Sequence, residues 1–469
     1  MYTFVVNDKP QPVEPTMKIK KGQKQSVSVF QNIAERLAGK LPTKTKSFFL
    51  SLILGALLAV ARRRTVTQWL RAAQISDDFR QAFYHIPHIG RKSRLMFDEM
   101  IDVILEKLGP VIAAAAFIRL VLDDSPTKRY GKKIEGAGYH HNPTPGRTNA
   151  KHCFGHSWVV AVIVVTHPLF GEISFPIAAE LYLRQKEIAK LEGRYARQFK
   201  TKTAMAADIV KRLTPKFKAF DKPIEVIVDG GYARDTVLLP LQKLDGVVTI
   251  TRLRRDAVLF EVPPPRKPGQ RGATKKYGDR IDVKSMVESN RGWRYVQCRQ
   301  YGQVVTKKVK WFVAASKLTK GKPVKVVLVK EDEKTWVPLM STDATMEVKE
   351  ILESYGVRFG IEEVFKDLKE VWGWGKQELR LLESNEAATA MNMLLYAMVE
   401  LSTWDRTAEE LVDRRSCPWD DGERRPSHSD RRNFLRHGML SNEFNEALNV
   451  SFMPKNIIHA LERLLKLAA

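Results

Sequence analysis

Four side chains between residues 355 and 369 combine a carboxylate with a phenol and two cations. They are Tyr355, Arg358, Glu362 and Lys369. At about 100° per helical residue, all four fall within roughly 60° of arc on one helix edge. Apolar residues of the same segment lie on a separate arc that flanks this edge, so we predict that the polar edge borders a cleft. The alternative is a solvated helix face with ordinary charge pairs.

The same helical geometry distinguishes two adjacent acids. Glu363 projects with Lys366 and Glu370 toward the outward arc, whereas Glu362 shares the edge that carries Arg358. We therefore predict that Glu362 is the functional carboxylate.

Two further carboxylates stand where apolar strands are expected to end. Asp123 ends the run L-V-L-D-D-S, and Asp229 ends V-I-V-D-G-G-Y. A carboxylate at the end of a buried strand is rigidly aimed, as a metal ligand must be. Asp also ends strands as an ordinary turn former, so each is weak evidence alone. Asp124 is an alternative to Asp123, but alternation along a strand sends the two side chains to opposite faces.

The composition indicates a folded protein that binds a polyanion. Of the 469 residues, 78 are Lys or Arg and 53 are Asp or Glu, which gives a formal charge of +25, and 44% are hydrophobic. Such a charge favours nucleic acid as the partner. The longest apolar run, residues 48 to 61, is too short to span a bilayer, and the N-terminus does not resemble an export signal. We expect no membrane association and a cytoplasmic, nucleoid-associated location.

The cysteines and histidines do not form a ligand pattern that we can defend. Cys153, Cys298 and Cys417 are far apart and form no C-x-x-C pair, so we expect reduced, structural thiols. Histidines between 140 and 156 crowd around Cys153, and their spacing matches no zinc motif. Phosphate contacts or local packing are the preferred interpretations for them.

Periodicity divides the chain into parts of different character. Residues 1–25 are basic and rich in Pro, and 26–112 are helical. Thr65 or Thr67 is a candidate helix N-cap in a helix-turn-helix that would turn Arg62, Arg63, Arg64 and Arg71 toward DNA, although small helical bundles look alike. Residues 401–469 are expected to be helical.

The middle of the chain predicts an α/β fold. Three strands from about residue 117 are followed by helix, strand, helix and strand, which is the order of an RNase H-like core. We assign 113–252 and 341–400 to this mixed-sheet core. A β-rich insertion, 253–340, interrupts it and delays the last helix, which bears Glu362.

Together, Asp123, Asp229 and Glu362 predict a site for two Mg²⁺ ions, with Mn²⁺ expected to substitute. One ion would activate water or a 3′-hydroxyl, and the other would stabilise the leaving oxygen of an in-line displacement. No covalent protein nucleophile is required.

The chain resembles the bacterial insertion-sequence transposases of the DDE type, in the group with the Tyr-x2-Arg-x3-Glu-x6-Lys signature. Residues 355 to 369 match that spacing in full, Asp123-Asp124-Ser125 fits the first acid, and Asp229-Gly230-Gly231 fits the second. The resemblance implies a cut-and-paste reaction with a hairpin intermediate, performed by a homodimer on terminal inverted repeats and target DNA. It also implies that Tyr355, Arg358 and Lys369 hold end phosphates and that Trp336 stacks on a flipped base.

Basic residues near the predicted acids are candidates for further DNA backbone contacts. They are Arg252 and Arg254 after the fifth strand, and Lys128 and Arg129 after the first acid. Solvated surface charge is the alternative for each.

Two other functions compete with the transposase interpretation. A different RNase H-fold nuclease or resolvase would not need the signature, and a catalytically inactive, domesticated DNA-binding protein would be expected to have lost an acid.

Overall fold

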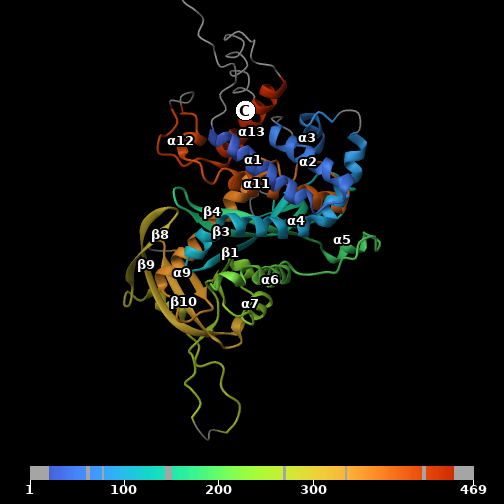
Figure 1. The fold of residues 1–469 in the computed structure, drawn as a ribbon. Helices are drawn as coiled ribbons and strands as arrows, with labels where there is room; N and C mark the ends of the chain where they lie inside the picture. The colour runs from blue at the N-terminus through green and yellow to red at the C-terminus, as the bar shows by residue number, and fades with distance from the viewer. Residues whose placement is uncertain are drawn as a thin grey trace, which may run out of the picture.

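The fold, taken from a computed structural model, is a mixed α/β architecture with helical regions at both ends (Figure 1). The structure describes residues 21–59, 64–75, 79–142, 150–267, 271–332, 335–414 and 419–447. Eleven of its strands form one mixed sheet. The predicted fold class, a mixed-sheet α/β fold with helical N-terminal and C-terminal regions, is confirmed.

The strands of the sheet are β1 Ile118–Lys128, β2 Gly138–His141, β3 His152–His167, β4 Gly171–Tyr182, β5 Ile224–Val228, β6 Val247–Arg252, β7 Leu259–Phe260, β8 Arg294–Gln300, β9 Gln303–Ser316, β10 Pro323–Lys330 and β11 Trp336–Ser341. The described α-helices are α1 Lys21–Ala38, α2 Thr43–Leu58, α3 Val66–Ala72, α4 Phe79–Ala114, α5 Gln185–Ala189, α6 Lys202–Leu213, α7 Asp235–Leu241, α8 Val283–Glu288, α9 Val348–Gly356, α10 Phe359–Glu370, α11 Leu382–Ser402, α12 Ala408–Leu411 and α13 His428–Ala447. Short 3-10 helices follow at η2 Thr214–Phe220, η3 Gly230–Tyr232 and η4 Lys317–Thr319.

Five strands form the centre of the sheet in the order β4, β3, β1, β5, β6. β1 pairs antiparallel with β3, and β3 pairs antiparallel with β4. β5 lies parallel to β1, and β6 lies parallel to β5. The two parallel connections run through helices, as parallel strands require. These strands and helices follow the order predicted from the sequence.

The strands of the predicted insertion continue the central sheet. β11 pairs antiparallel with β6, with Leu339 opposite Arg252, and β10, β9 and β8 follow outward. A separate apolar cluster lies under this extension and includes Leu238 of α7, Leu328 of β10 and Met340 of β11. The extension is therefore anchored to the core by backbone pairing, while the division into domains stays a prediction.

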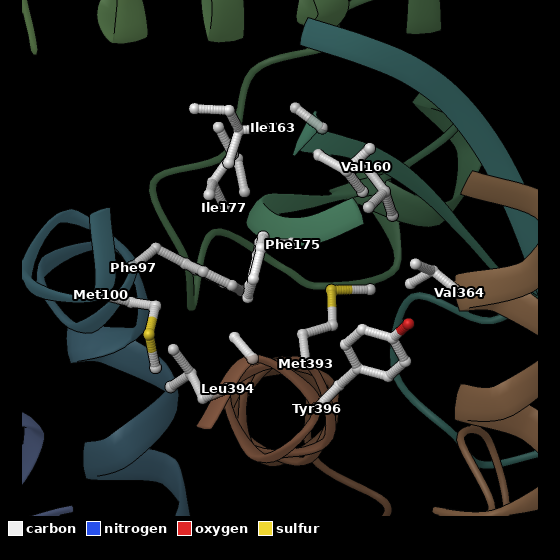
Figure 2. Close-up of a cluster of buried hydrophobic side chains, with 14 of the residues drawn as sticks. Phe97, Met100, Val160, Ile163, Phe175, Ile177, Val364, Met393, Leu394 and Tyr396 are labelled. Atoms are coloured by element: carbon white, nitrogen blue, oxygen red, sulfur yellow. The ribbon is translucent and has the colours of Figure 1, made fainter. Parts of the chain in front are cut away.

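Helices cover both faces of the central strands (Figure 1). α4 and α11 pack against each other and against β4, whereas α6 packs on β3 from the side that carries α7. Figure 2 shows how the first layer is filled: Phe97 of α4 and Leu394 of α11 lie with Phe175 of β4 and Ile163 of β3 in one apolar cluster. This buried layer fixes the central strands in place.

The helical N-terminal part differs from expectation at its start. α1 begins at Lys21, so residues 21–25 of the predicted basic arm are helical, and residues 1–20 lie outside the described part. Thr65 is the N-cap of α3, where its side chain accepts a hydrogen bond from the Gln68 amide. Arg62 and Arg63 lie outside the described residues. The predicted role of this region in DNA binding stays a prediction.

The apolar run near residue 50 forms α2, whose Leu52 and Leu57 are buried in the core. No helix among the described residues is long and apolar enough to cross a membrane. Cys153 and Cys298 are buried, free thiols, and Cys417 lies outside the described residues.

Candidate active site

The two predicted aspartates lie side by side at one edge of the sheet. In the parallel pairing of β1 and β5, Leu122 is opposite Val228, so the next residues of the two strands, Asp123 and Asp229, are neighbours. Neighbouring strands are about 4.8 Å apart, and residues in register point to the same face. The backbone of Asp229 is still extended, which continues this alternation. The fold thus brings together two carboxylates that are far apart in the chain.

The third predicted acid is connected to this pair through an arginine. Arg358 Nη1 lies 3.3 Å from Asp123 Oδ2, and Arg358 Nη2 lies 2.5 Å from Glu362 Oε1. Arg358 is the N-cap residue of α10, because the predicted single helix is interrupted after Gly356 by a tight turn. Tyr355 therefore ends α9, while Glu362 stands in the first turn of α10.

The apolar face of α10 holds Glu362 at the sheet. Ile361, Val364 and Leu368 are buried, as the predicted apolar arc requires. Glu363 is exposed, and so is Glu362, but of these two only Glu362 contacts Arg358 in the described structure. Helix geometry predicted that Glu362 and not Glu363 would share an edge with Arg358, and the contacts of the two acids agree with this.

Burial makes Asp123 an unusual carboxyl group. Desolvation raises the pKa of Asp123 to about 7, and the negative charges of Asp124 and Asp229 add to the rise. The amide of Asp124 and the guanidinium of Arg358 oppose it. A carboxyl group with these neighbours is short of positive charge, which a metal cation would supply.

Asp124 points to the other face of β1, as strand alternation predicts. Its carboxylate accepts a hydrogen bond from the Tyr232 hydroxyl at 3.0 Å and pairs with Lys202 Nζ at 2.5 Å. Burial, together with the charge of Asp124, raises the pKa of Tyr232 above its usual range. Sequence reasoning missed both partners, because they come from η3 and α6 and share no local motif with β1.

Tyr355 and Arg252 lie on the Asp229 side of the site. The Arg358 guanidinium stands over the Tyr355 ring at 6.0 Å from its centroid. Burial raises the pKa of Tyr355, the charges of Arg358 and Arg252 oppose this rise, and the charge of Asp229 adds to it. Arg252 is exposed at the end of β6. A phenol and two guanidinium groups therefore surround the carboxylate pair.

Lys369 lies on the other side of Asp123, and Lys128 lies further along β1. Lys369 Nζ donates to Ser125 Oγ at 2.7 Å, and Ser125 is two residues beyond Asp123 on the same face of β1. Burial lowers the pKa of Lys369, and the charge of Lys128 lowers it further. Lys128 is exposed. Alternation along β1 directs Lys128 to the face of Asp124, so of the two lysines only Lys369 shares the face of Asp123.

Arg129 is not the surface contact that the sequence suggested. It is 6% exposed, and its guanidinium donates to the Gly375 carbonyl and to Asn385 Oδ1. Alternation after the exposed Lys128 turns it inward, where it links β1 to the start of α11. Arg254 is exposed but forms a two-bond ion pair with Asp256.

Trp336 lies near the acids but on the opposite face of the sheet. It is three residues before Leu339, which is opposite Arg252, so it stands beyond the end of β6 at which Asp229 also emerges. Trp336 packs beside the second apolar cluster, whereas Arg252 points to the face of Tyr355. The Arg255 guanidinium lies 5.8 Å from its ring centroid. Its predicted base contact stays a prediction.

The acids match divalent metal ions in the kind of ligand they offer. Asp123, Asp229 and Glu362 are oxygen ligands of the type that Mg²⁺ prefers. In the structure, Arg358 stands between Asp123 and Glu362, and across the described ranges no three His, Cys, Asp or Glu side chains are grouped closely enough to hold an ion. The three acids are therefore ligands of a suitable type, and Arg358 occupies the space between Asp123 and Glu362. The histidines around Cys153 form no such group either, as far as the described residues extend.

A family model for DDE superfamily endonucleases matches residues 36–311. This match spans more than half of the chain, and the protein belongs to that family. The matched range contains Asp123 and Asp229 but ends before Glu362. Among solved structures, the chain is similar to a piggyBac transposase synaptic complex with hairpin DNA, with 11% identity, 96% of this chain and 77% of that chain covered, and a TM-score of 0.38. No curated protein gives a significant match.

Proposed function

We propose that this protein is a DNA transposase that cuts and joins DNA ends with Asp123, Asp229 and Glu362. The observation that carries the proposal is the placement of Asp123 beside Asp229, with Arg358 joining Asp123 to Glu362. Membership of the DDE endonuclease family supports DNA cleavage as the reaction class. The signature spacing of residues 355 to 369 supports a bacterial insertion-sequence enzyme, acting on nucleoid DNA in the cytoplasm.

Asp123, Asp229 and Glu362 would hold two Mg²⁺ ions, or Mn²⁺ in their place. When bound, the ions would supply activation of the attacking oxygen and stabilisation of the leaving oxygen. The protein residues then orient the DNA around this site. Tyr355 and Arg252 would hold a phosphate on the Asp229 side, and Lys369 would hold one beside Ser125. Lys128 would contact the DNA backbone further along β1.

In this proposal Arg358 binds different partners without and with DNA. In the DNA-free structure its guanidinium bridges Asp123 and Glu362. A DNA phosphate is an alternative partner for the same planar donor group. DNA binding therefore draws Arg358 away from the acids and leaves their oxygen atoms for the ions.

The finer steps follow from the resemblance to the signature group. A hairpin intermediate, pairing of two ends in a homodimer and strand transfer into target DNA belong to this proposal. A junction resolvase of related fold is the alternative function. It shares the acids and the charge, but it has no need for the phenol and cations around Glu362.

The decisive experiment uses the full chain, Mg²⁺ and duplex DNA that carries the ends flanking its gene. Wild-type protein is expected to nick these ends and to form hairpin products on a denaturing gel. Glu362→Gln should abolish cleavage, whereas the matched control Glu363→Gln, which alters the exposed neighbour, should retain it. The site assignment fails if Glu362→Gln cleaves normally, and a preference for four-way junctions over element ends would favour the resolvase.

A further inference from the structure

A row of four side chains crosses the outer strands β8 to β11. Tyr295 on β8 is opposite Lys308 on β9, Lys308 is opposite Lys330 on β10, and Lys330 is opposite Trp336 on β11. Residues directly opposite in neighbouring strands point to the same face. At about 4.8 Å per strand spacing, this aromatic-lysine row is about 14 Å long.

Aromatic rings flank the cations within and beside the row. Lys308 Nζ lies 5.9 Å from the Tyr295 ring centroid, and Lys330 Nζ lies 5.9 Å from the ring centroid of Trp293, which directly precedes β8. Arg255 adds a third cation over Trp336. Cation–π contacts hold these groups together without neutralising them.

The two lysines at the centre of the row are an unfavourable pair by themselves. Like charges directly opposite in a sheet are destabilising. Within the described ranges, neither Lys308 nor Lys330 forms an ion pair with a carboxylate, and the ammonium groups of both lie over aromatic rings. A ligand with negative charge at the centre and flat rings beside it would satisfy every member of the row.

The row is open at one end, where Tyr295 is exposed, and its other members Lys308, Lys330 and Trp336 are half-buried. Tyr295 is 72% exposed. The residues further along the same face, such as Lys310, are covered by α8 and the residue after it, because Lys310 donates to the carbonyls of Met286 and Ser289. The row therefore marks the edge of the covered part of this face. It stands beyond the end of β6, at which Asp229 emerges, and on the other side of the sheet from Asp123.

We infer that the aromatic-lysine row binds an unpaired DNA strand, with backbone phosphate at Lys308 and Lys330 and a base stacked on Tyr295. Stacking suits an unpaired strand, because only there is the face of a base free. The position suits a strand that passes the carboxylates and turns over the edge of β6 and β11. This inference rests on the proposed function, to which it adds a second DNA contact apart from the cleavage site.

The test measures binding of the full chain to a labelled single-stranded oligothymidylate and to a duplex of equal length, by fluorescence anisotropy over a range of salt concentrations. Tyr295→Ala should weaken single-strand binding by about 5- to 160-fold, the factor that corresponds to removal of one stacked base. Tyr295→Phe should restore it. Because Tyr295 is largely exposed, neither change threatens the fold.

The lysines are tested by the slope of log affinity against log salt. The double variant Lys308→Gln, Lys330→Gln should reduce the single-strand slope by about 1.4, because each phosphate that is no longer neutralised lowers the slope by about 0.7. The matched controls are Tyr301→Ala, 68% exposed in the turn of the same hairpin, and the double variant Lys320→Gln, Lys322→Gln at the opposite end of β9. Both controls should bind as the wild type does.

The inference is overturned if wild-type protein does not bind the single strand, if Tyr295→Ala binds as tightly as wild type, or if the control lysines reduce the slope as much as the row lysines. Cleavage assays on the same preparations separate the two proposals. If cleavage depends on Glu362 but the row variants do not change single-strand binding, only the inference about the row is refuted. If single-strand binding depends on the row but Glu362→Gln still cleaves DNA, only the proposed active site is refuted.

Discussion

Replacing Asp123 by asparagine is expected to stabilise the metal-free protein at neutral pH while it removes an active-site ligand. In the folded state, burial raises the pKa of Asp123 from 3.8 to about 7. Below about pH 4 both the folded and the unfolded chain hold this proton, so the carboxyl group costs nothing. Between about pH 4 and 7 folding takes up a proton, and the stability of the wild type falls as pH rises. Asparagine carries no such cost.

The size of the effect follows from the shift. From pH 5 to the folded-state pKa is about two units, and each unit is worth about 1.36 kcal/mol, so the gain from Asp123→Asn grows by at most about 3 kcal/mol between pH 5 and 8. The side chain is only 20% exposed, so solvent screening reduces this value modestly. For a chain of 469 residues, about 1 kcal/mol corresponds to about 1 °C in Tm. The difference in Tm should therefore grow by about 2 to 3 °C.

The assay is thermal unfolding of both proteins in EDTA at pH 5, 6, 7 and 8. The Tm of Asp123→Asn minus that of wild type should rise through this range and level off above pH 7. Asp245→Asn, at an exposed carboxylate, serves as the control, and its difference should stay small. A difference for Asp123→Asn that does not change with pH, or one that becomes negative at pH 8, would refute the account of a buried, charge-deficient carboxyl group.

Three further predictions concern basic residues in and around the site. Arg358→Gln should raise the affinity of the DNA-free protein for Mn²⁺, measured by electron paramagnetic resonance, because it removes the group that competes for Asp123 and Glu362; unchanged affinity would exclude this competition. Arg129→Ala should lower Tm by about 2 to 6 °C, since it leaves two acceptors without donors at about 1 to 3 kcal/mol each. Lys128→Ala should leave Tm nearly unchanged and reduce the salt slope for duplex DNA by about 0.9; the reverse order of effects would contradict the placement of the two residues.

The central strands could be predicted from the sequence, and so could the face of the sheet to which their side chains point. Alternation in β1 separates Asp123 from Asp124, and the apolar spacing of α10 buries Ile361 and leaves Glu363 exposed. These are local properties of a strand and a helix, and local periodicity reports them.

Properties that depend on distant pairing could not be predicted in this way. Arg129 continues a basic run and reads as surface charge, but its acceptors come from Gly375 and Asn385, which are about 250 residues away in the chain. The register that places Tyr295 in line with Trp336 depends on three strand pairings at once. No local pattern in the sequence encodes such a register.

The most direct test of the central claim is an anomalous diffraction map of the protein bound to Mn²⁺ and duplex DNA that carries the element ends. The account predicts manganese peaks coordinated by Asp123, Asp229 and Glu362, with Arg358 moved from between the acids to a DNA phosphate. Manganese bound elsewhere, with Arg358 still joining Asp123 to Glu362 in a complex that cleaves DNA, would contradict it.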